Sequence, residues 1–230
     1  MHVCLFDIDG TLIASGGAGK AALEAALAEE FGIPHILDKM QLSGRTDRAI
    51  IANLFRLHFI DDTPDNHERL RDAYLRHLPR YLHAGRVLPG IADLLAHLTG
   101  RKDVAIGLLT GNVRAGAKAK LGYFGLDDYF AFGGYGDHHL DRDDVAREAL
   151  AEIRHHFNGS VHPERIWVIG DTPLDIRCAR SIGARAVAVA TGWHGLAELA
   201  EHQPDLLLAD LSNPAPLLSS WVSRPLEGFD

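Results

Sequence analysis

The sequence predicts an α/β fold: a parallel sheet with helices on both faces and an all-helical segment inserted after the first strand. Short apolar runs of strand length alternate with helical segments along most of the chain, which is the pattern of strand–helix–strand units. The interval between the first and second apolar runs holds helical spacing alone. With 230 residues, the chain is long enough for one to two domains, each with its own core.

Five apolar runs are expected to be buried parallel strands, because each is continuous rather than alternating with polar residues. They are residues 3–8, Val104–Leu109, Arg165–Ile169, Ala186–Ala190 and Leu206–Ala209. Tyr129–Gly133 is a candidate for a further short strand. The helical segments between the runs include Ile91–Leu98, Asp143–Phe157 and Leu174–Ile182.

The inserted segment divides the chain into a core, residues 1–14 and 87–230, and a helical cap, residues 15–86. Its expected helices are Ala18–Phe31, Asp47–His58 and Pro64–His83. Glycines at both junctions, in Ser15-Gly16-Gly17 and Ala84-Gly85-Arg86, either permit hinge motion or belong to ordinary helix-flanking loops. After Asp210, a segment with three prolines is expected to wrap the surface or fray.

The composition argues against several classes of partner. The net charge is −8 and the basic residues are scattered, whereas nucleic acids and anionic membranes require a dense basic surface. No apolar run approaches the roughly 18 residues that span a bilayer, and the N-terminus lacks the features of a secretory signal. Cys4 and Cys178 lie in apolar segments, which fits a reducing cytoplasm better than a disulfide framework. The 14 histidines match no zinc-ligand spacing and are expected at the surface.

An acidic pair follows the first apolar run, in Phe6-Asp7-Ile8-Asp9-Gly10-Thr11. Residues i and i+2 of an extended chain point the same way, so Asp7 and Asp9 are expected to project together. Gly10 then allows a sharp turn away from the sheet. Because open parallel α/β sheets bind ligands at the carboxyl ends of their strands, the pair is expected in a binding site.

Two more strand ends carry polar residues. The run that ends at Leu109 is followed by Thr110-Gly111-Asn112, whose hydroxyl and backbone N–H groups suit phosphate oxygens. The run that ends at Ile169 leads through Gly170 to Asp171-Thr172-Pro173-Leu174-Asp175. Asp175 has capping-box spacing and is either a helix cap, a site residue or both. Asp171 precedes the cap and has no such structural role.

The charges of this arrangement predict a metal. Asp7, Asp9 and Asp171 are expected at one edge of the sheet, and two carboxylates about 4 Å apart repel by about 4 kcal/mol at an effective dielectric near 20. Three partly desolvated carboxylates therefore require a cation among them. Oxygen ligands select a hard divalent ion, and phosphate chemistry favours Mg²⁺.

Three segments, in this order, resemble the haloacid dehalogenase-like hydrolase superfamily. They are Asp-x-Asp-Gly-Thr at residues 7–11, the strand-ending Thr-Gly-Asn at 110–112 and Gly-Asp-Thr-Pro-x-Asp at 170–175. The resemblance covers nearly the whole chain and implies a Rossmann-like core with an inserted helical cap. Leu88-Pro89-Gly90 and the amphipathic helix after it look like the phosphoglycolate phosphatase and β-phosphoglucomutase branch.

The resemblance also implies a phosphoryl-transfer mechanism. Asp7 would be the nucleophile that becomes an aspartyl phosphate, and Asp9 would be the general acid and then the general base. Thr110, with the backbone of Gly111 or Asn112, would hold the transferring phosphoryl group. The implied ligands of Mg²⁺ are all oxygen donors: Asp7, the backbone carbonyl of Asp9, Asp171 and, in or behind this set, Asp175.

The family usually has a lysine before a helix on the side of the third strand. In this sequence Arg142 takes that place, although its planar fork is not equivalent to an ammonium. A surface ion pair is the other interpretation of Arg142, which stands among acidic residues. Two further basic residues are alternatives for the catalytic role: Arg114 and Lys118.

One loop of the insert, Ser43-Gly44-Arg45-Thr46-Asp47, leads into an expected helix. It resembles cap loops of the sugar-phosphate mutase branch, which place an arginine over the distal anion of the substrate. Arg45 is therefore a candidate specificity residue. The alternative is a helix-entry loop whose arginine meets only solvent.

Together these features favour a phosphatase that acts on a small soluble phosphate ester. A sugar-phosphate mutase, in which Asp9 returns the phosphoryl group to a rotated intermediate, is the second enzymatic interpretation. Dehalogenases and phosphonate-cleaving relatives lack the second aspartate of Asp-x-Asp, so Asp9 counts against both. The intact Asp7, Asp9, Thr110 and Asp171 argue against a non-catalytic regulatory or binding module. A helical lid implies a small substrate, because closure must exclude water.

Overall fold

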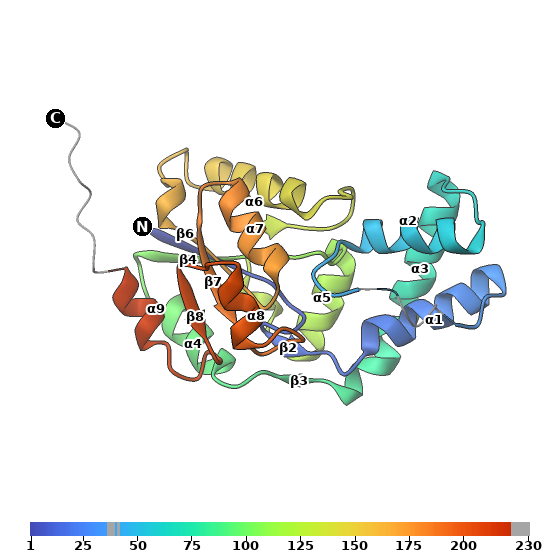
Figure 1. The fold of residues 1–230 in the computed structure, drawn as a ribbon, viewed down its shortest axis with the longest axis horizontal. Coiled ribbons are helices and arrows are strands. Elements are labelled where there is room, and N and C mark those ends of the chain that lie inside the picture. Colours follow the sequence, from blue (N-terminus) through green and yellow to red (C-terminus); the bar gives the residue numbers. More distant parts are fainter. Residues whose placement is uncertain (36–39, 41, 222–230) are drawn as a thin grey trace.

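The computed structural model describes residues 1–35, 40 and 42–221, and at its centre lies a six-stranded sheet (Figure 1). All neighbouring strands are parallel, in the order β5-β4-β1-β6-β7-β8. The strands are β1 (His2–Phe6), β4 (Val104–Leu109), β5 (Gly133–Gly134), β6 (Ile166–Gly170), β7 (Arg185–Val189) and β8 (Leu206–Leu208). Because β1 lies between β4 and β6, the loops after these three strands meet at one edge of the sheet.

Helices cover both faces of the sheet, which is apolar on both sides. One face carries α4 (Ile91–Thr99), α5 (Arg114–Tyr123) and α9 (Ala215–Ser220), and the other carries α6 (Arg142–His156), α7 (Pro173–Ser181) and α8 (Leu196–Glu201). Side chains of β1 alternate between the two layers, with Cys4 and Phe6 in the first and Val3 and Leu5 in the second. Each face of the sheet therefore has its own hydrophobic core.

The predicted parallel sheet is confirmed, and one predicted strand is wrong in position. Tyr129 ends a short 3₁₀ helix, η2 (Asp127–Tyr129), and the additional strand is β5, where Gly133 pairs with Leu108 of β4. A Cβ at Gly133 would lie 2.6 Å from the Leu108 carbonyl oxygen, so the close approach requires glycine. Two glycines carry no apolar pattern, which explains why the aromatic run before them was the stronger signal.

A separate helical unit, consisting of α1 (Ala18–Phe31), α2 (Asp47–His58) and α3 (Pro64–Tyr81), lies beyond the carboxyl ends of the strands (Figure 1). The unit has its own hydrophobic cluster, which includes Leu27, Phe55 and Leu70. Two short antiparallel strands join it to the core: β2 (Ile13–Ala14) and β3 (Arg86–Val87). The sequence did not predict this pair, because two residues are too few to show an alternating pattern.

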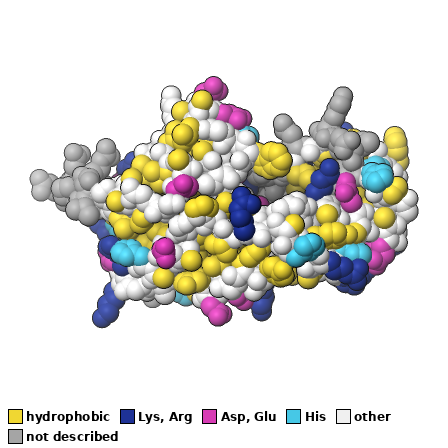
Figure 2. All heavy atoms as spheres, turned by 90° about the horizontal axis from the view of Figure 1, so that it is seen from below, with side chains coloured by type: hydrophobic (Ala, Val, Ile, Leu, Met, Phe, Trp, Pro, Cys, Tyr) yellow, Lys and Arg dark blue, Asp and Glu magenta, His cyan; other side chains and the backbone are white. Residues whose placement is uncertain are grey.

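The remaining described elements are short. Two further 3₁₀ helices are η1 (Leu82–Ala84) and η3 (Pro163–Arg165). The chain after β8 returns to the sheet through α9, which buries Leu217, while residues 222–230 of the predicted wrapping segment lie outside the described residues. Within the described ranges, no helix is long and apolar enough to cross a membrane. On the face drawn in Figure 2, Lys and Arg side chains are scattered among acidic ones.

Candidate active site

Asp7 and Asp9 follow β1 at the carboxyl edge of the sheet. The backbone N–H of Asp7 donates to the carbonyl oxygen of Ile169 at 2.9 Å. This bond fixes the backbone of Asp7 against β6, and the Asp7 carboxylate is buried. Gly10 then turns the chain with a φ of 84°, a left-handed conformation that favours glycine. A Cβ at this position would also overlap the Asp171 carboxylate. Gly10 therefore lets the loops after β1 and β6 lie against each other.

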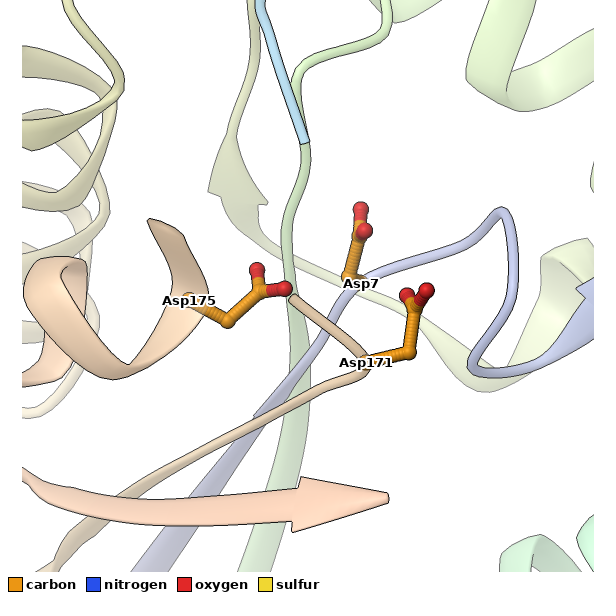
Figure 3. A group of neighbouring side chains, drawn as sticks. All are labelled: Asp7, Asp171 and Asp175. Carbon is orange, nitrogen blue, oxygen red and sulfur yellow. The ribbon is translucent and has the colours of Figure 1, made fainter. Parts of the chain in front are cut away.

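Asp171 follows β6 and Asp175 lies in the first turn of α7. Figure 3 shows their carboxylates close to that of Asp7. One oxygen of each of the three lies within 4.8 Å of the others. We call Asp7, Asp171 and Asp175 the carboxylate cluster. All three side chains are buried, at 5%, 1% and 2% exposure, so the structure brings three predicted site residues together away from bulk water.

Asp175 belongs both to the helix start and to the cluster. Its Oδ2 accepts hydrogen bonds from the backbone N–H and the hydroxyl of Thr172, at 3.0 and 2.7 Å. The bond from the backbone N–H is the Asp175 half of a capping box, in which the Thr172 side chain accepts from the Asp175 N–H. Its Oδ1 accepts a hydrogen bond from Arg142 Nη2 at 2.5 Å. The two interpretations of Asp175 from the sequence are therefore compatible, since each uses a different oxygen.

Arg142 begins α6 and reaches two members of the cluster. Its Nη2 lies 3.0 Å from Asp7 Oδ2 and 2.5 Å from Asp175 Oδ1, and its Nη1 donates to the carbonyl oxygen of Gly44 at 2.8 Å. At 3% exposure, Arg142 is not a surface ion pair. The two alternatives from the sequence are exposed on α5: Arg114 and Lys118.

Burial and mutual repulsion determine the charge state of the cluster. Burial raises the pKa of Asp7 to about 6, although the charge of Arg142 opposes this change. Burial, together with the charges of Asp175 and Asp7, raises the pKa of Asp171 to about 8. The raised pKa values show that one guanidinium does not balance three ionised carboxylates, which would leave an excess of two negative charges. A divalent cation balances such an excess and prefers oxygen ligands, so the cluster is compatible with a divalent metal.

Asp9 lies two residues from Asp7, but its side chain is not part of the cluster. Its Oδ2 accepts hydrogen bonds from Lys120 Nζ at 2.6 Å and from Asn112 Nδ2 at 2.9 Å. Burial alone would raise the pKa of Asp9, but the charge of Lys120 and these hydrogen bonds hold it below its usual range. Any metal contact of Asp9 is thereby left to its backbone carbonyl, which is the contact that the family resemblance implies.

The loop after β4, Thr110-Gly111-Asn112, lies beside Asp9 and is called here the phosphate loop. Thr110 Oγ1 accepts hydrogen bonds from the backbone N–H and the Nδ2 of Asn112, at 3.3 and 2.8 Å. Because the Thr110 oxygen accepts both bonds, its own proton is available to a further acceptor. The three predicted phosphate-binding residues thus form one loop, with a buried hydroxyl donor.

Lys120 is a site residue that sequence reasoning missed. It lies on α5, is 3% exposed and also donates to Asn112 Oδ1 at 2.6 Å. The buried face of α5 consists of Gly116, Ala117, Lys120 and Leu121, which is the spacing of an apolar helix face. A lysine within that stripe was the signal that could have identified it.

The loop before α2 is seated on the core. Thr46 Oγ1 donates to the carbonyl oxygen of His139 at 2.7 Å. Asp47 makes two reciprocal contacts: its N–H donates to Gly111 O at 2.7 Å, and its Oδ2 accepts from Val113 N at 2.8 Å. Asp47 was also missed, and burial raises its pKa to about 6. These bonds fasten the start of α2 to the phosphate loop and the residue after it.

Arg45 lies in the same loop, but its guanidinium lies against the first turn of α2. Its Nη2 donates to the Ala49 carbonyl oxygen at 3.3 Å, and Arg45 lines an open groove of about 480 Å³ together with Arg56 and Leu140. No member of the carboxylate cluster lines this groove. It is the backbone carbonyl of Arg45 that presses on Gly111, where a Cβ would overlap it. The structure therefore does not bring the Arg45 guanidinium together with the other predicted site residues.

The fold and these contacts define a class of enzyme. Oxygen ligands for a cation, a loop with a hydroxyl donor for an anion, and a separate aspartate held by an ammonium lie at one edge of a parallel sheet. Together they are the groups that a hydrolase of phosphate esters requires.

Comparison with known proteins gives the family. The chain belongs to the haloacid dehalogenase-like hydrolases, whose family model matches residues 1–183. It is 31% identical over 222 residues to a phosphoglycolate phosphatase of Synechococcus elongatus, covering 96% of this chain and 97% of that relative. It is 28% identical over 198 residues to an N-acetylmuramic acid 6-phosphate phosphatase of Pseudomonas putida, covering 84% of each. Family and relatives agree that the chain is a phosphatase.

A solved structure supports the fold. A hydrolase from Pseudomonas syringae superposes with a TM-score of 0.74 at 23% identity, with 96% of this chain and 99% of that chain covered. The similarity extends over both the parallel sheet and the helical unit, because almost the whole of each chain is matched. At this level of identity it describes the architecture alone.

Proposed function

We propose that this protein is a Mg²⁺-dependent phosphomonoester hydrolase that forms an aspartyl phosphate on Asp7 and acts on a small phosphorylated carboxylic acid. The observation that carries the proposal is the buried carboxylate cluster, whose charge exceeds that of Arg142. Buried and unbalanced carboxylates destabilise a fold unless a cation accompanies them. The excess charge therefore supports a metal site.

The donor set suits Mg²⁺. In the proposed site the ligands are Asp7, Asp171 and the backbone carbonyl of Asp9, with Asp175 in or behind this set. When bound, Mg²⁺ neutralises the carboxylates and withdraws charge from the phosphoryl oxygens. Gly10 and Gly192 leave the space that Asp171 occupies, since a Cβ at either position would overlap its carboxylate.

In the first proposed step, a carboxylate oxygen of Asp7 attacks phosphorus, and the bond from phosphorus to the leaving oxygen breaks. Arg142, 3.0 Å from Asp7 Oδ2, holds that oxygen and orients the nucleophile. Asp9, whose pKa Lys120 and Asn112 hold below its usual range in the free enzyme, must carry a proton at this step; it gives that proton to the leaving oxygen, so the alcohol departs neutral. The Thr110 hydroxyl, with the backbone of Gly111 and Asn112 beside it, stabilises the transferring phosphoryl group.

In the second step, Asp9 takes a proton from water while the water oxygen attacks phosphorus. The bond between Asp7 and phosphorus breaks, which releases phosphate and restores the Asp7 carboxylate. Asp9 is then protonated again and ready for the next ester. The separate position of Asp9 supports this exchange of roles, because its side chain is bound to Lys120 and Asn112 rather than to the cluster.

The substrate class is supported by the relatives. The two relatives described above are named for phosphate esters of acids, phosphoglycolate and N-acetylmuramic acid 6-phosphate. A short phosphorylated acid is therefore expected, with phosphoglycolate as the first candidate. Arg45 is the proposed partner of the carboxylate, because its loop contacts Gly111 and its fork suits a carboxylate. This role requires the guanidinium to turn from α2 toward the phosphate loop.

We also propose a cytoplasmic location for the enzyme. Both cysteines, Cys4 and Cys178, are buried and unpaired. Free thiols persist most readily in a reducing compartment. Fractionation of cells of the source organism, with an antibody against this chain, tests the location.

Turnover of p-nitrophenyl phosphate and phosphoglycolate tests the proposed function. Activity is expected with Mg²⁺, and it should disappear with EDTA and in Asp7→Asn. A sugar-phosphate mutase would instead isomerise β-glucose 1-phosphate and require a bisphosphate activator. Failure to hydrolyse any phosphate ester in the presence of Mg²⁺ would overturn the proposal.

A further inference from the structure

The buried amine of Lys120 is not used by the mechanism described so far. Lysine is rarely buried without a partner, and removing an ammonium from water costs several kcal/mol unless hydrogen bonds compensate. Lys120 is nevertheless 3% exposed. The cation that faces the nucleophile is Arg142, 3.0 Å from Asp7, so Lys120 does not duplicate that role.

Lys120 and Asn112 both donate hydrogen bonds to one oxygen of Asp9. Its Nζ lies 2.6 Å from Asp9 Oδ2, and Asn112 Nδ2 donates to the same oxygen at 2.9 Å. Lys120 and Asn112 are also joined to each other, through Nζ and Oδ1 at 2.6 Å. The three side chains therefore form a closed triangle, which leaves the Asp9 carboxylate little freedom to rotate.

The other oxygen of Asp9, Oδ1, is available for proton transfer. Among the described residues, Asp9 Oδ1 is buried and no partner meets hydrogen-bond geometry, although a buried carboxylate oxygen normally has one. The Ser15 side chain lies close enough to the carboxylate to help lower its pKa. With Oδ2 held by two donors, a proton shared with the substrate can only sit on Oδ1. The triangle thus selects which oxygen of Asp9 exchanges the proton.

The helical unit closes over the same ammonium. The ring of Tyr74, from α3, packs against α5, where a Cβ at Gly116 would lie 3.5 Å from it. A Cβ at Gly19, from α1, would lie 3.8 Å from Lys120 Nζ. Residues of α1 and α3 in the helical unit therefore help to keep Lys120 away from solvent.

We propose that Lys120 is a positioning residue that fixes the Asp9 carboxylate with Oδ1 toward the leaving oxygen of the substrate. This inference rests on the proposed function, because Asp9 must be the group that protonates that oxygen. Lys120 itself touches neither substrate nor the reacting phosphorus. Its effect should therefore depend on how much the leaving group needs a proton.

The experiment compares kcat/KM for two esters in the wild type, Lys120→Met and Lys118→Met. The leaving group of phosphoglycolate is an alkoxide, which requires a proton, whereas p-nitrophenolate leaves without one. General acid catalysis contributes about 10²–10⁴-fold. Lys120→Met should therefore lower kcat/KM for phosphoglycolate by about 10²-fold, and kcat/KM for p-nitrophenyl phosphate by only about tenfold. Lys118 is exposed on the same helix, so Lys118→Met should match the wild type with both esters.

Two measurements separate positioning from a general disturbance of the fold. In an Asp9→Asn background, Lys120→Met should have no further effect on the rate of the first turnover of phosphoglycolate, because the two residues act as one unit. Lys120→Arg should recover part of the lost activity toward phosphoglycolate. Equal losses with both esters, or full additivity with Asp9→Asn, would overturn the inference. A wild-type enzyme inactive on both esters would refute the proposed function, whereas equal losses in an otherwise active enzyme refute only the role of Lys120.

Discussion

Asp7 and Asp9 lie two residues apart, yet their surroundings are opposite. Asp7 shares a buried space with Asp171 and Asp175 against one guanidinium, and burial raises its pKa to about 6. Asp9 has an ammonium and an amide on a single oxygen, and Lys120 holds its pKa below the usual range despite burial. In the first environment one guanidinium faces three carboxylates, whereas in the second one ammonium faces a single carboxylate. Two identical residues that follow the same strand, two positions apart, therefore receive different chemistry from their surroundings.

Removing each aspartate should separate the two environments most strongly. Asp7→Asn leaves no nucleophile, so we expect kcat to fall by about 10³-fold or more with every ester. Asp9→Asn should affect kcat/KM for phosphoglycolate far more than for p-nitrophenyl phosphate, because only the former needs a proton donor. Rapid-mixing kinetics of the first turnover with both esters measures the difference. Identical substrate dependence of the two variants would show that the two aspartates are not divided in this way.

Arg142 supplies the positive charge of the first environment. In Arg142→Met the buried carboxylates lose their fixed cation, and breaking a buried pair costs about 3–5 kcal/mol of unfolding free energy. We expect kcat to fall by about 10²-fold as the nucleophile loses its orientation. Urea unfolding and kinetics in Mg²⁺ test both effects. Arg114→Met is the matched control, because Arg114 is exposed and stacks on Tyr135 with a 4.0 Å centroid distance.

Arg45 lies outside both environments and should affect binding alone. We expect Arg45→Ala to raise KM for phosphoglycolate by about tenfold, the loss of about 1.4 kcal/mol of binding, while kcat and the turnover of p-nitrophenyl phosphate stay the same. Asn53→Ala, which alters the same groove without removing a charge, is the control. An unchanged KM for every acidic ester would show that Arg45 does not bind the substrate and belongs to a helix-entry loop whose arginine meets only solvent.

The smallest expected effect is the pH dependence of stability without metal. The folded-state pKa values of Asp7 and Asp171, about 6 and about 8, exceed the ordinary value of 3.8. The folded state then binds more protons than the unfolded state, so these two groups reduce stability as the pH rises from about 4 to about 8.

Asp171→Asn isolates this effect from all other titrating groups. In EDTA, its melting temperature should exceed that of the wild type by an amount that grows across that range, on the order of several degrees. Calorimetry of both proteins from pH 4 to pH 8 provides the measurement. In Mg²⁺ the wild type should regain the difference, since bound ligand stabilises the folded state. A difference that is independent of pH would contradict the raised pKa of Asp171.

The fold and part of the site follow from local sequence patterns. The parallel sheet and the three helices of the helical unit follow from apolar spacing, and the ranges Ala18–Phe31 and Asp47–His58 agree with α1 and α2 at both ends. Asp7 and Asp171 follow strand ends directly, so topology predicts their meeting. Asp175 was left open between a helix cap and a site role, and the expectation that the Asp9 side chain joins the cluster was wrong, because that side chain is bound to Lys120 and Asn112.

The other residues depend on packing that spacing does not reveal. Whether Lys118 or Lys120 faces the interior is decided by the rotation of α5 against the helical unit. In the sequence, Asp47 resembles an ordinary residue of a first helical turn. Only the structure shows that its backbone N–H donates to the Gly111 carbonyl oxygen. The short strands β2 and β3 exist only as a pair brought together across the whole insertion.

Trapping the phosphoenzyme tests the central claim most directly. Asp9→Asn with p-nitrophenyl phosphate and Mg²⁺ should release nitrophenolate in a stoichiometric burst and then stall, because no base activates the water. Acid quench followed by peptide mass spectrometry should place the phosphoryl group on Asp7. A phosphoryl group on any other residue, or continued turnover with no phosphorylated peptide at all, would contradict the account.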